Sequence, residues 1–454
     1  MTIRPFLNTV MAVLILLQFC PGALADEAAF KELVTLNKKI LTEQLDLSVT
    51  SLDMQLASAN YHKYRKWIDY GGQEASASGF LVSGIVGTDQ IGHNIDTPLK
   101  VNKNSLVKAL NAGMAGTIVG ASASASQILM DGVDSIVRKK GNTRIVRKNF
   151  LKRLSGLDQM IETRKKLVAT DPDLASSKLI ASEGKLLDAL RDMICTEFYK
   201  TYCYVTDAQV SQTVFYGLDV ARNTTGAIGA GVLKRSLFKP DLTPAANTWF
   251  MVSGAITIGA PWVSSGAGKI WRKVAEKRLQ KRLDLSGEPV VEHVLACRKE
   301  LREAMKSEQN ESIKNMYPVT EVTAALDESH GSLEKRVMAG LIQKEKYRRT
   351  AFQQKFASAA IGGQFLAFGI IGNASYQKYG KHLRLRKWNR CLTAANIITI
   401  SATSLAIGAT GAAALAGEYA EWKGRRSKDR VQDMLDSRIK DIESVKGEIL
   451  KVQP

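Results

Sequence analysis

The chain has 454 residues, of which 45% are apolar, 24% charged and 7% aromatic, and 35 residues are glycine. This composition excludes a wholly disordered chain, and the scarcity of aromatics among many small residues argues against a large β-sandwich core. Lys and Arg outnumber Asp and Glu by 63 to 44, which gives a formal net charge of +19 at pH 7.

The first 25 residues predict a secretory signal peptide. Arg4 precedes an apolar run over residues 6–19, and Ala23 and Ala25 stand directly before Asp26. The run is shorter than the about 20 residues that cross a bilayer, and an A-x-A pattern is typical of a signal peptidase site. We expect cleavage before Asp26 and entry into the secretory pathway. An uncleaved membrane anchor is the alternative.

Four long uncharged runs follow, over residues 109–130, 242–268, 356–377 and 391–417. Each has at least 20 residues, enough to cross about 30 Å of hydrocarbon as a helix. They are rich in Gly, Ala, Ser and Thr, so buried core helices of a soluble protein are the alternative.

Two weaker segments cover residues 75–88 and 210–233. The first is cut short by flanking carboxylates. The second carries Asp219 and Arg222, which lie three residues apart and can pair on a helix, so the cost of placing them in a membrane is lowered. Whether these two segments cross is left open.

Small residues recur every four positions in these runs. In lipid, such faces let helix backbones approach closely, whereas in water each glycine costs a helix about 1 kcal/mol relative to alanine. The pattern therefore predicts packed membrane helices, with self-association through the same faces as a further expectation. The predicted helix-packing residues are Gly116, Gly120, Gly259, Gly363 and Gly408.

The six segments form three pairs at a spacing of roughly 140 residues, which suggests a threefold repeat of helical hairpins. Between them, apolar residues at helical spacing, such as Phe150, Leu154, Leu157 and Ile161, predict amphipathic helical modules. The expected fold is an all-α helical membrane protein. Its expected parts are a signal peptide (1–25), a helix plus first hairpin (26–143), a module (144–208), a second hairpin (209–268), a module (269–355), a third hairpin (356–417) and a C-terminal amphipathic helix (418–454).

Basic residues cluster beside the uncharged runs, and several tryptophans lie near the run ends. This placement predicts contact with a bilayer that has anionic headgroups, and a solvated basic surface is the alternative. No basic face with interleaved aromatics is evident, so nucleic acid is not an expected partner. The predicted headgroup contacts are Arg272, Lys273, Arg384, Arg386, Lys387, Arg425 and Arg426.

Orientation is left open by the sequence. A cleaved signal would place the turns of the hairpins on the cytoplasmic side, and these turns are positive. The stretches that begin at Arg138, Lys269 and Lys423, on the opposite side, are at least as positive.

No catalytic pattern is recognisable. A nucleophile elbow, an H-E-x-x-H helix, a P-loop and a dinucleotide fingerprint are all missing, and the glycines of residues 226–231 suit helix packing better than phosphate binding. Only His293 lies near a cysteine, Cys297, so neither a metal site nor a cofactor is expected. After the signal, the remaining cysteines lack a C-x-x-C pair and their disulfide state is open: Cys195, Cys203, Cys297 and Cys391.

Two functional classes remain. The first is a non-catalytic integral α-helical membrane protein of the envelope or secretory pathway, with a structural or interaction role. The alternative is an exported protein that inserts its hairpins into a target membrane, as pore-forming or translocator proteins do. A transporter is a third, weaker reading, because Asp219 and Arg222 are its only candidate intramembrane charges.

Overall fold

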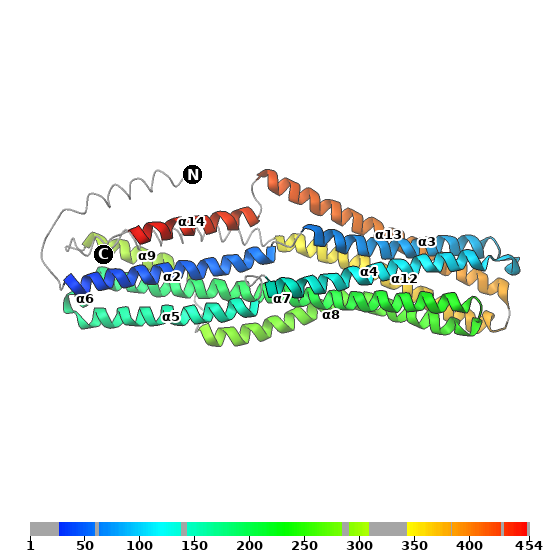
Figure 1. Ribbon diagram of the computed structural model, residues 1–454, viewed down its shortest axis with the longest axis horizontal. Coiled ribbons are helices and arrows are strands. Elements are labelled where there is room, and N and C mark those ends of the chain that lie inside the picture. The colour runs from blue at the N-terminus through cyan, green and yellow to red at the C-terminus, as the bar shows by residue number, and fades with distance from the viewer. Residues whose placement is uncertain are drawn as a thin grey trace.

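The computed structural model describes residues 27–59, 63–137, 143–283, 290–307, 343–382, 384–427 and 431–451. The predicted signal peptide lies outside these residues. The described part contains eleven α-helices and no strand, which confirms the expected all-α class. The helices run along one long axis and form an elongated molecule (Figure 1).

The molecule has two halves, which we call the module and the bundle. The module contains α2 (Glu27–Ala59), α5 (Thr143–Thr170), α6 (Pro172–Ser176), α9 (Val290–Ser307) and α14 (Val431–Lys451). The bundle contains α3 (Lys63–Gly92), α4 (Lys103–Val137), α12 (Gln343–Ser375) and α13 (Leu385–Ser427). Two long helices, α7 (Lys178–Ser236) and α8 (Thr243–Leu283), pass from one half into the other (Figure 1).

The module has a conventional apolar core. The amphipathic stripes predicted from the sequence turn inward, so that Phe150, Leu157 and Phe198 are fully buried. The rings of Phe150 and Phe198 stack with centroids 3.7 Å apart. Leucine, isoleucine and valine side chains from α2, α5, α7 and α14 surround them, and burial of this apolar surface stabilises the module as in a water-soluble domain.

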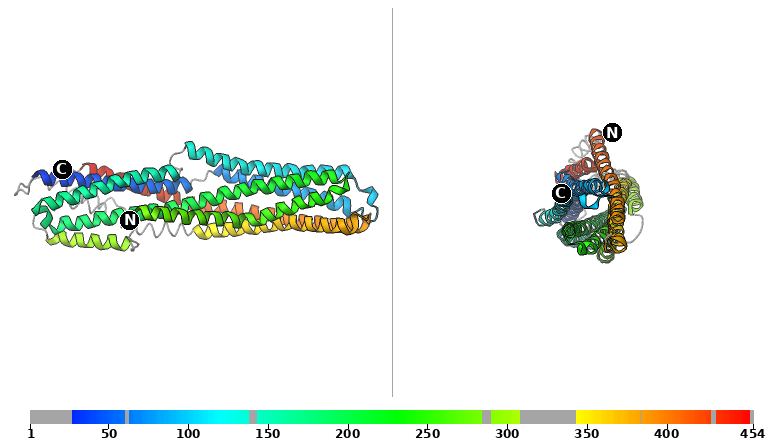
Figure 2. Two further views of the ribbon diagram at one scale, coloured as in Figure 1. Left: turned by 90° about the horizontal axis from the view of Figure 1, so that it is seen from below. Right: turned by 90° about the vertical axis from the view of Figure 1, so that its right-hand side faces the viewer.

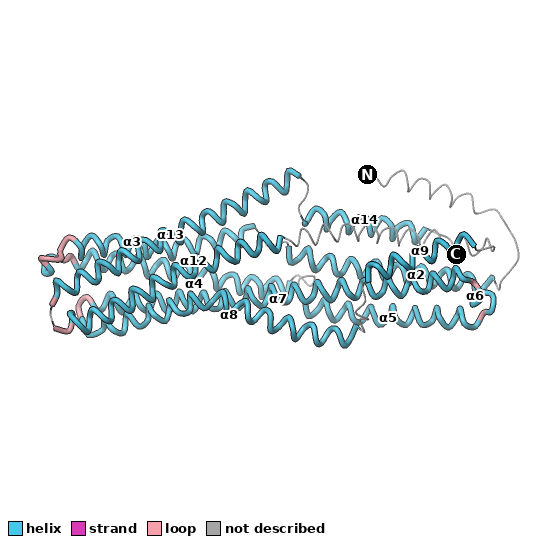
Figure 3. Tube along the Cα trace, turned by 180° about the vertical axis from the view of Figure 1, so that it is seen from behind, coloured by secondary structure: helices cyan, strands magenta, loops and turns pink. Residues whose placement is uncertain are grey.

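The bundle consists of three antiparallel helix pairs, each joined by a short turn. The pair α3–α4 turns through a 3₁₀ segment, Pro98–Lys100, the pair α7–α8 through a second one, Pro240–Leu242, and the pair α12–α13 through a π-helical turn, Tyr376–Gly380. The side chain of Asn102 caps α4 by accepting the N–H of Ser105 at 3.2 Å. All three turns lie at the end of the molecule farthest from the module (Figure 3), and we call them the tip.

The six helix segments of the bundle close into a ring. Each packs against two neighbours in the order α3, α4, α7, α8, α12 and α13, and α13 packs back against α3. Ring order equals chain order, and neighbouring segments are antiparallel. Figure 2 shows the helices lengthwise and from the tip. The domain boundaries predicted near residues 208 and 268 fall inside α7 and α8, which continue without a break.

Candidate functional site

Bundle helices approach one another closely at glycines. A Cβ atom built on Gly79 of α3 would lie 2.6 Å from the Ala112 carbonyl oxygen of α4. A Cβ on Gly254 of α8 would lie 2.7 Å from the Gly362 carbonyl oxygen of α12, and a Cβ on Gly362 would lie 2.8 Å from the Gly254 carbonyl oxygen. These helices therefore touch backbone to backbone, a geometry that only glycine permits at these positions.

The structure places the five predicted helix-packing glycines in two kinds of surroundings. Gly116 packs against the Ala75 carbonyl of α3, and a Cβ on Gly120 would lie 3.1 Å from the Asn223 amide of α7. Gly259, Gly363 and Gly408 have no atom of another residue near the place of a Cβ. Between α8 and α12 the close contact is made instead by Gly254 and Gly362, which lie on a different face of their helices from Gly259 and Gly363.

The interior of the ring is polar apart from one cluster of phenylalanine rings. Serine, threonine, asparagine and glutamine side chains from five of the six segments, all except α3, are buried in the bundle, where a soluble bundle would have mainly leucine and isoleucine. These buried polar residues are Thr117, Ser124, Gln127, Asn223, Asn247, Ser253, Thr257, Ser264, Gln364, Asn396, Thr399 and Thr403. Many are hydrogen-bonded, and Thr403 donates to the Gln364 side-chain oxygen at 2.6 Å. The spacing of residues in the sequence did not predict that these uncharged side chains are buried together.

A buried ion pair occupies the interior on the module side. The Arg222 guanidinium pairs with the Asp219 carboxylate one helical turn earlier, as its spacing predicted. The same carboxylate accepts hydrogen bonds from Ser124 of α4 at 2.5 Å and from Asn223 at 3.0 Å, and Ser76 of α3 donates to the Asn223 side-chain oxygen at 3.0 Å. The pair thus links three helices of the ring, which reduces the cost of burying its charges.

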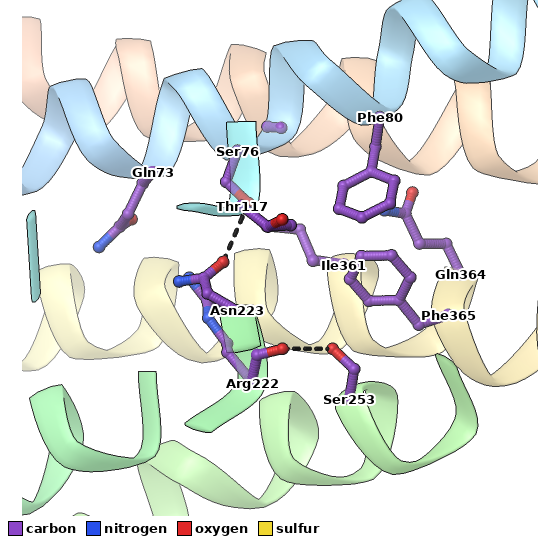
Figure 4. Close-up of a pocket in the computed structure, with 11 residues that line it drawn as sticks. Gln73, Ser76, Phe80, Thr117, Arg222, Asn223, Ser253, Ile361, Gln364 and Phe365 are labelled. Carbon is purple, nitrogen blue, oxygen red and sulfur yellow. Dashed lines mark hydrogen bonds between the residues drawn. The ribbon is translucent and has the colours of Figure 1, made fainter. Parts of the chain in front are cut away.

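A small cavity lies next to this network (Figure 4). Gln73, Ser76, Thr117 and Asn223 supply polar atoms to its wall, and its volume is about 20 Å³. A cavity needs about 10–15 Å³ on this measure to hold one water molecule. This cavity can therefore hold one water among polar partners and is too small for an organic substrate.

Phenylalanine rings close the interior on the tip side of the cavity. Phe80 and Phe365 have ring centroids 4.7 Å apart, and Phe250 lies 6.0 Å from Phe365 and 6.3 Å from Phe80. On α3 and α8, Phe80 and Phe250 are nearer the tip than the polar residues Ser76 and Ser253. These rings form an apolar cluster that fills the space between α3, α8 and α12.

The exterior of the ring is apolar. Large aliphatic and aromatic side chains point away from the bundle over most of its length. These exposed residues are Val82, Ile85, Ile118, Val119, Leu129, Ile228, Trp249, Val252, Trp262, Val263, Ile370, Ile397, Ile398 and Leu405. Because polar side chains lie inside and apolar ones outside, the bundle reverses the pattern of a water-soluble domain, whereas the module follows it.

The module contains a buried ion pair of its own. The Arg164 guanidinium of α5 pairs with Glu183 of α7 at 3.0 Å and donates to the Asn37 side-chain oxygen of α2 at 2.7 Å. Asn37 in turn donates to Glu183 at 2.9 Å. This closed set of bonds joins three module helices.

The predicted headgroup residues lie at both ends of the bundle. Arg384, Arg386 and Lys387 are exposed at the tip. Arg272, Lys273 and Arg426 are exposed on the module side. Arg272 there pairs with Glu276 at 2.7 Å and Arg426 lies 5.6 Å from the Trp422 ring centre. The side chain of Arg425 lies outside the described residues.

No described group of three or more His, Cys, Asp or Glu side chains is arranged to hold a metal ion. The Cys297 sulfur lies 3.8 Å from the Nε2 atom of His293, a contact of two groups within one helix. All four cysteines outside the first 26 residues are free thiols. Burial raises the pKa of Cys195 to about 12 and the pKa of Cys203 to about 11, which makes both thiols unreactive.

By length and apolar composition, one helix of the described part could cross a membrane: α13 over Leu385–Tyr419, with a mean hydropathy of 1.6. Comparison with known proteins found no family model that matches the chain and no curated relative.

Proposed function

We propose that the chain is an integral α-helical membrane protein with a structural or interaction role and no catalytic role. In this proposal the six segments of the bundle cross the bilayer as three repeated hairpins, and the module stands on one side. The observation that carries the proposal is the reversed polarity of the bundle, with Asp219, Arg222 and many amides and hydroxyls inside and aliphatic side chains outside. Lipid tails solvate such an exterior, whereas water does not.

Helix lengths support the proposal. The shortest bundle helix, α3, has 30 residues, of which the uncharged stretch covers residues 75–88, and about 20 residues suffice for the hydrocarbon core. Intramembrane charges in membrane proteins face the bundle interior and pair with one another, as Asp219 and Arg222 do. Trp67 and Trp262 are exposed toward the module end of the bundle, a placement typical of the aromatic belt at a membrane interface.

The position of the module favours a resident membrane protein over an exported inserting protein. A soluble precursor must cover its apolar exterior. Here the module lies end to end with the bundle (Figure 1), and residues such as Val82, Ile118 and Ile397 remain exposed. A monomer of this shape would expose a large apolar belt to water. The proposed localisation is therefore a membrane reached through the secretory pathway.

The test is alkaline carbonate extraction of membranes from cells that express the chain, combined with quenching of tryptophan fluorescence by lipids with brominated acyl chains. We expect the chain to stay in the membrane pellet. We also expect Trp262→Phe to remove part of the quenchable fluorescence, whereas Trp271→Phe, two helical turns nearer the module, removes less. A stable monomer recovered without detergent from the soluble fraction would refute the resident form and favour the inserting alternative.

A further inference from the structure

The tip carries a large excess of positive charge. Residues 89–108 contain three Lys and two Asp, residues 234–241 contain two Lys, one Arg and one Asp, and residues 378–390 contain six Lys or Arg and no acid. Twelve basic side chains therefore stand against three carboxylates. The basic side chains are exposed, except Lys234, which is half-buried. Convergence of the three turns at one end of the bundle (Figure 3) brings this charge together.

The three acidic residues have partners at the tip. Asp96 pairs with Arg386 at 2.5 Å, Asp89 lies 3.2 Å from the His93 ring nitrogen, and Asp241 accepts a hydrogen bond from the Tyr376 hydroxyl at 3.2 Å. Even if every carboxylate neutralised one Lys or Arg, nine positive charges would remain. A surface of this kind attracts phosphate groups.

Apolar side chains stand among these charges. Leu99 is 94% exposed beside Lys100, and Phe238 is 62% exposed beside Lys239. The ammonium of Lys103 lies 5.6 Å from the centre of the Phe238 ring. Apolar side chains that alternate with Lys and Arg are typical of segments that sit in the headgroup layer of a membrane, and they favour lipid over a soluble polyanion.

Two of the three basic stretches at the opposite end of the bundle carry less weight for orientation than the turns of the tip do. Charges count in the positive-inside rule when they lie in short connections, because long connections of more than about 60 residues are translocated largely regardless of charge. The turns of the tip are short. The basic stretches that begin at Arg138 and Lys269 belong to long connections, over residues 131–207 and 269–355, whose described helices include α5 and α9 of the module. The stretch that begins at Lys423 lies in a short segment and is the one that still opposes the tip.

We propose that the tip binds the anionic phospholipid headgroups of one leaflet, through their phosphate oxygens, and that this leaflet is the cytoplasmic one. The module then stands on the opposite side, where a cleaved signal peptide would deliver Asp26. The inference rests on the proposed crossing of the membrane by the bundle.

The binding test uses the full-length chain in detergent micelles and titrates phosphatidylglycerol or phosphatidylcholine, with bound lipid counted by native mass spectrometry. Loss of one basic side chain near an anionic surface weakens binding about fivefold. The tip variant Arg384→Gln, Arg386→Gln, Lys387→Gln is therefore expected to bind phosphatidylglycerol about a hundredfold more weakly. The matched control Lys277→Gln, Lys281→Gln, Arg282→Gln, on the exposed surface of α8 in the module, should bind like the unmodified chain.

Equal loss in the two variants, or no preference for phosphatidylglycerol over phosphatidylcholine, would overturn the headgroup site. If the tip variant does not fold, the salt dependence of lipid binding by the unmodified chain tests the headgroup site instead. Its binding of phosphatidylglycerol should weaken steeply as salt rises, and its binding of phosphatidylcholine should not.

Orientation is tested by labelling single cysteines with a membrane-impermeant maleimide in sealed vesicles of known sidedness. In a Cys391→Ser background, Lys239→Cys reports the tip and Lys281→Cys reports the module. We expect Lys239→Cys to react only from the cytoplasmic face and Lys281→Cys only from the other. The reverse result in a chain that resists carbonate extraction overturns the inference and leaves the membrane crossing intact. Release of the chain by carbonate refutes the crossing itself.

Discussion

Replacing Gly362 by alanine should destabilise the bundle, whereas the same change at Gly363 should not. A Cβ on Gly362 would lie 2.5 Å from the Ile258 Cγ1 atom, 2.8 Å from the Gly254 carbonyl oxygen and 3.0 Å from the Ile258 backbone nitrogen. Two of these three atoms belong to the backbone of α8, so rotation of a side chain cannot relieve the overlap. The helices must separate, and forced overpacking of this kind costs about 1–3 kcal/mol.

Gly363 provides the matched control, since it lies on the same helix and has open space around the place of a Cβ. Alanine there removes the glycine penalty of about 1 kcal/mol in a helix. The free energy of unfolding, measured in detergent by titration with denaturant and followed by circular dichroism, should fall for Gly362→Ala and stay level or rise for Gly363→Ala. Equal effects, or greater damage at Gly363, would refute the assignment of the packing face of α12.

Three further predictions concern the module. Glu183→Ala leaves the Arg164 guanidinium buried without its counterion, so the free energy of unfolding should fall by about 3–5 kcal/mol. The double variant Arg164→Met, Glu183→Leu removes both charges and should restore the free energy of unfolding, which checks the explanation. Burial raises the pKa of Asp46, but hydrogen bonds and charge from its Lys and Arg partners outweigh burial and leave the pKa below its ordinary 3.8. The Asp46 carboxylate should therefore add to the free energy of unfolding above pH 3.8, and this contribution should be lost as the pH falls through the lower pKa of the folded state. In the Asp46→Asn variant, the free energy of unfolding should depend less on pH over this range, as measured by denaturant titration at several pH values. Iodoacetamide at pH 8 should leave Cys195 and Cys203 unmodified in the folded chain and modify both in denaturant, as read by mass spectrometry, and modification of the folded chain at the denatured rate would contradict the buried placement.

The helical class and the module core were predictable because both depend on local patterns. Apolar residues at helical spacing, such as Phe150 and Leu157, can be buried together only on one face of a helix, and this face became the core. The continuity of α7 and α8 was not predictable from the same patterns. The composition of α7 changes sharply along the chain without a proline to end the helix, and α8 continues through Pro261, a residue that usually ends or bends a helix.

The packing faces of the bundle were harder to predict. Adjacent glycines such as Gly362 and Gly363 look alike in sequence, and the partner helix decides which one makes the contact. Spacing predicted the pairing of Asp219 with Arg222, but it did not predict their contacts with Asn223 and Ser124. In a helix made mostly of small residues, the sequence does not show which uncharged polar side chains face the interior. The signal that could have found them is the abundance of amides and hydroxyls in runs long enough to cross a membrane.

The continuity of α7 has a mechanical consequence. At 1.5 Å per residue, its 59 residues form a rod about 90 Å long, and the part before residue 208 accounts for about 45 Å of it. The rod has no hinge at the border between module and bundle, and α8 runs beside it across the same border. Tilting or rotating the module therefore requires bending two adjacent helices. A binding partner would therefore meet the module at a fixed distance from the bundle and in a fixed orientation to it. A force applied to the module would be transmitted directly to the helices of the ring.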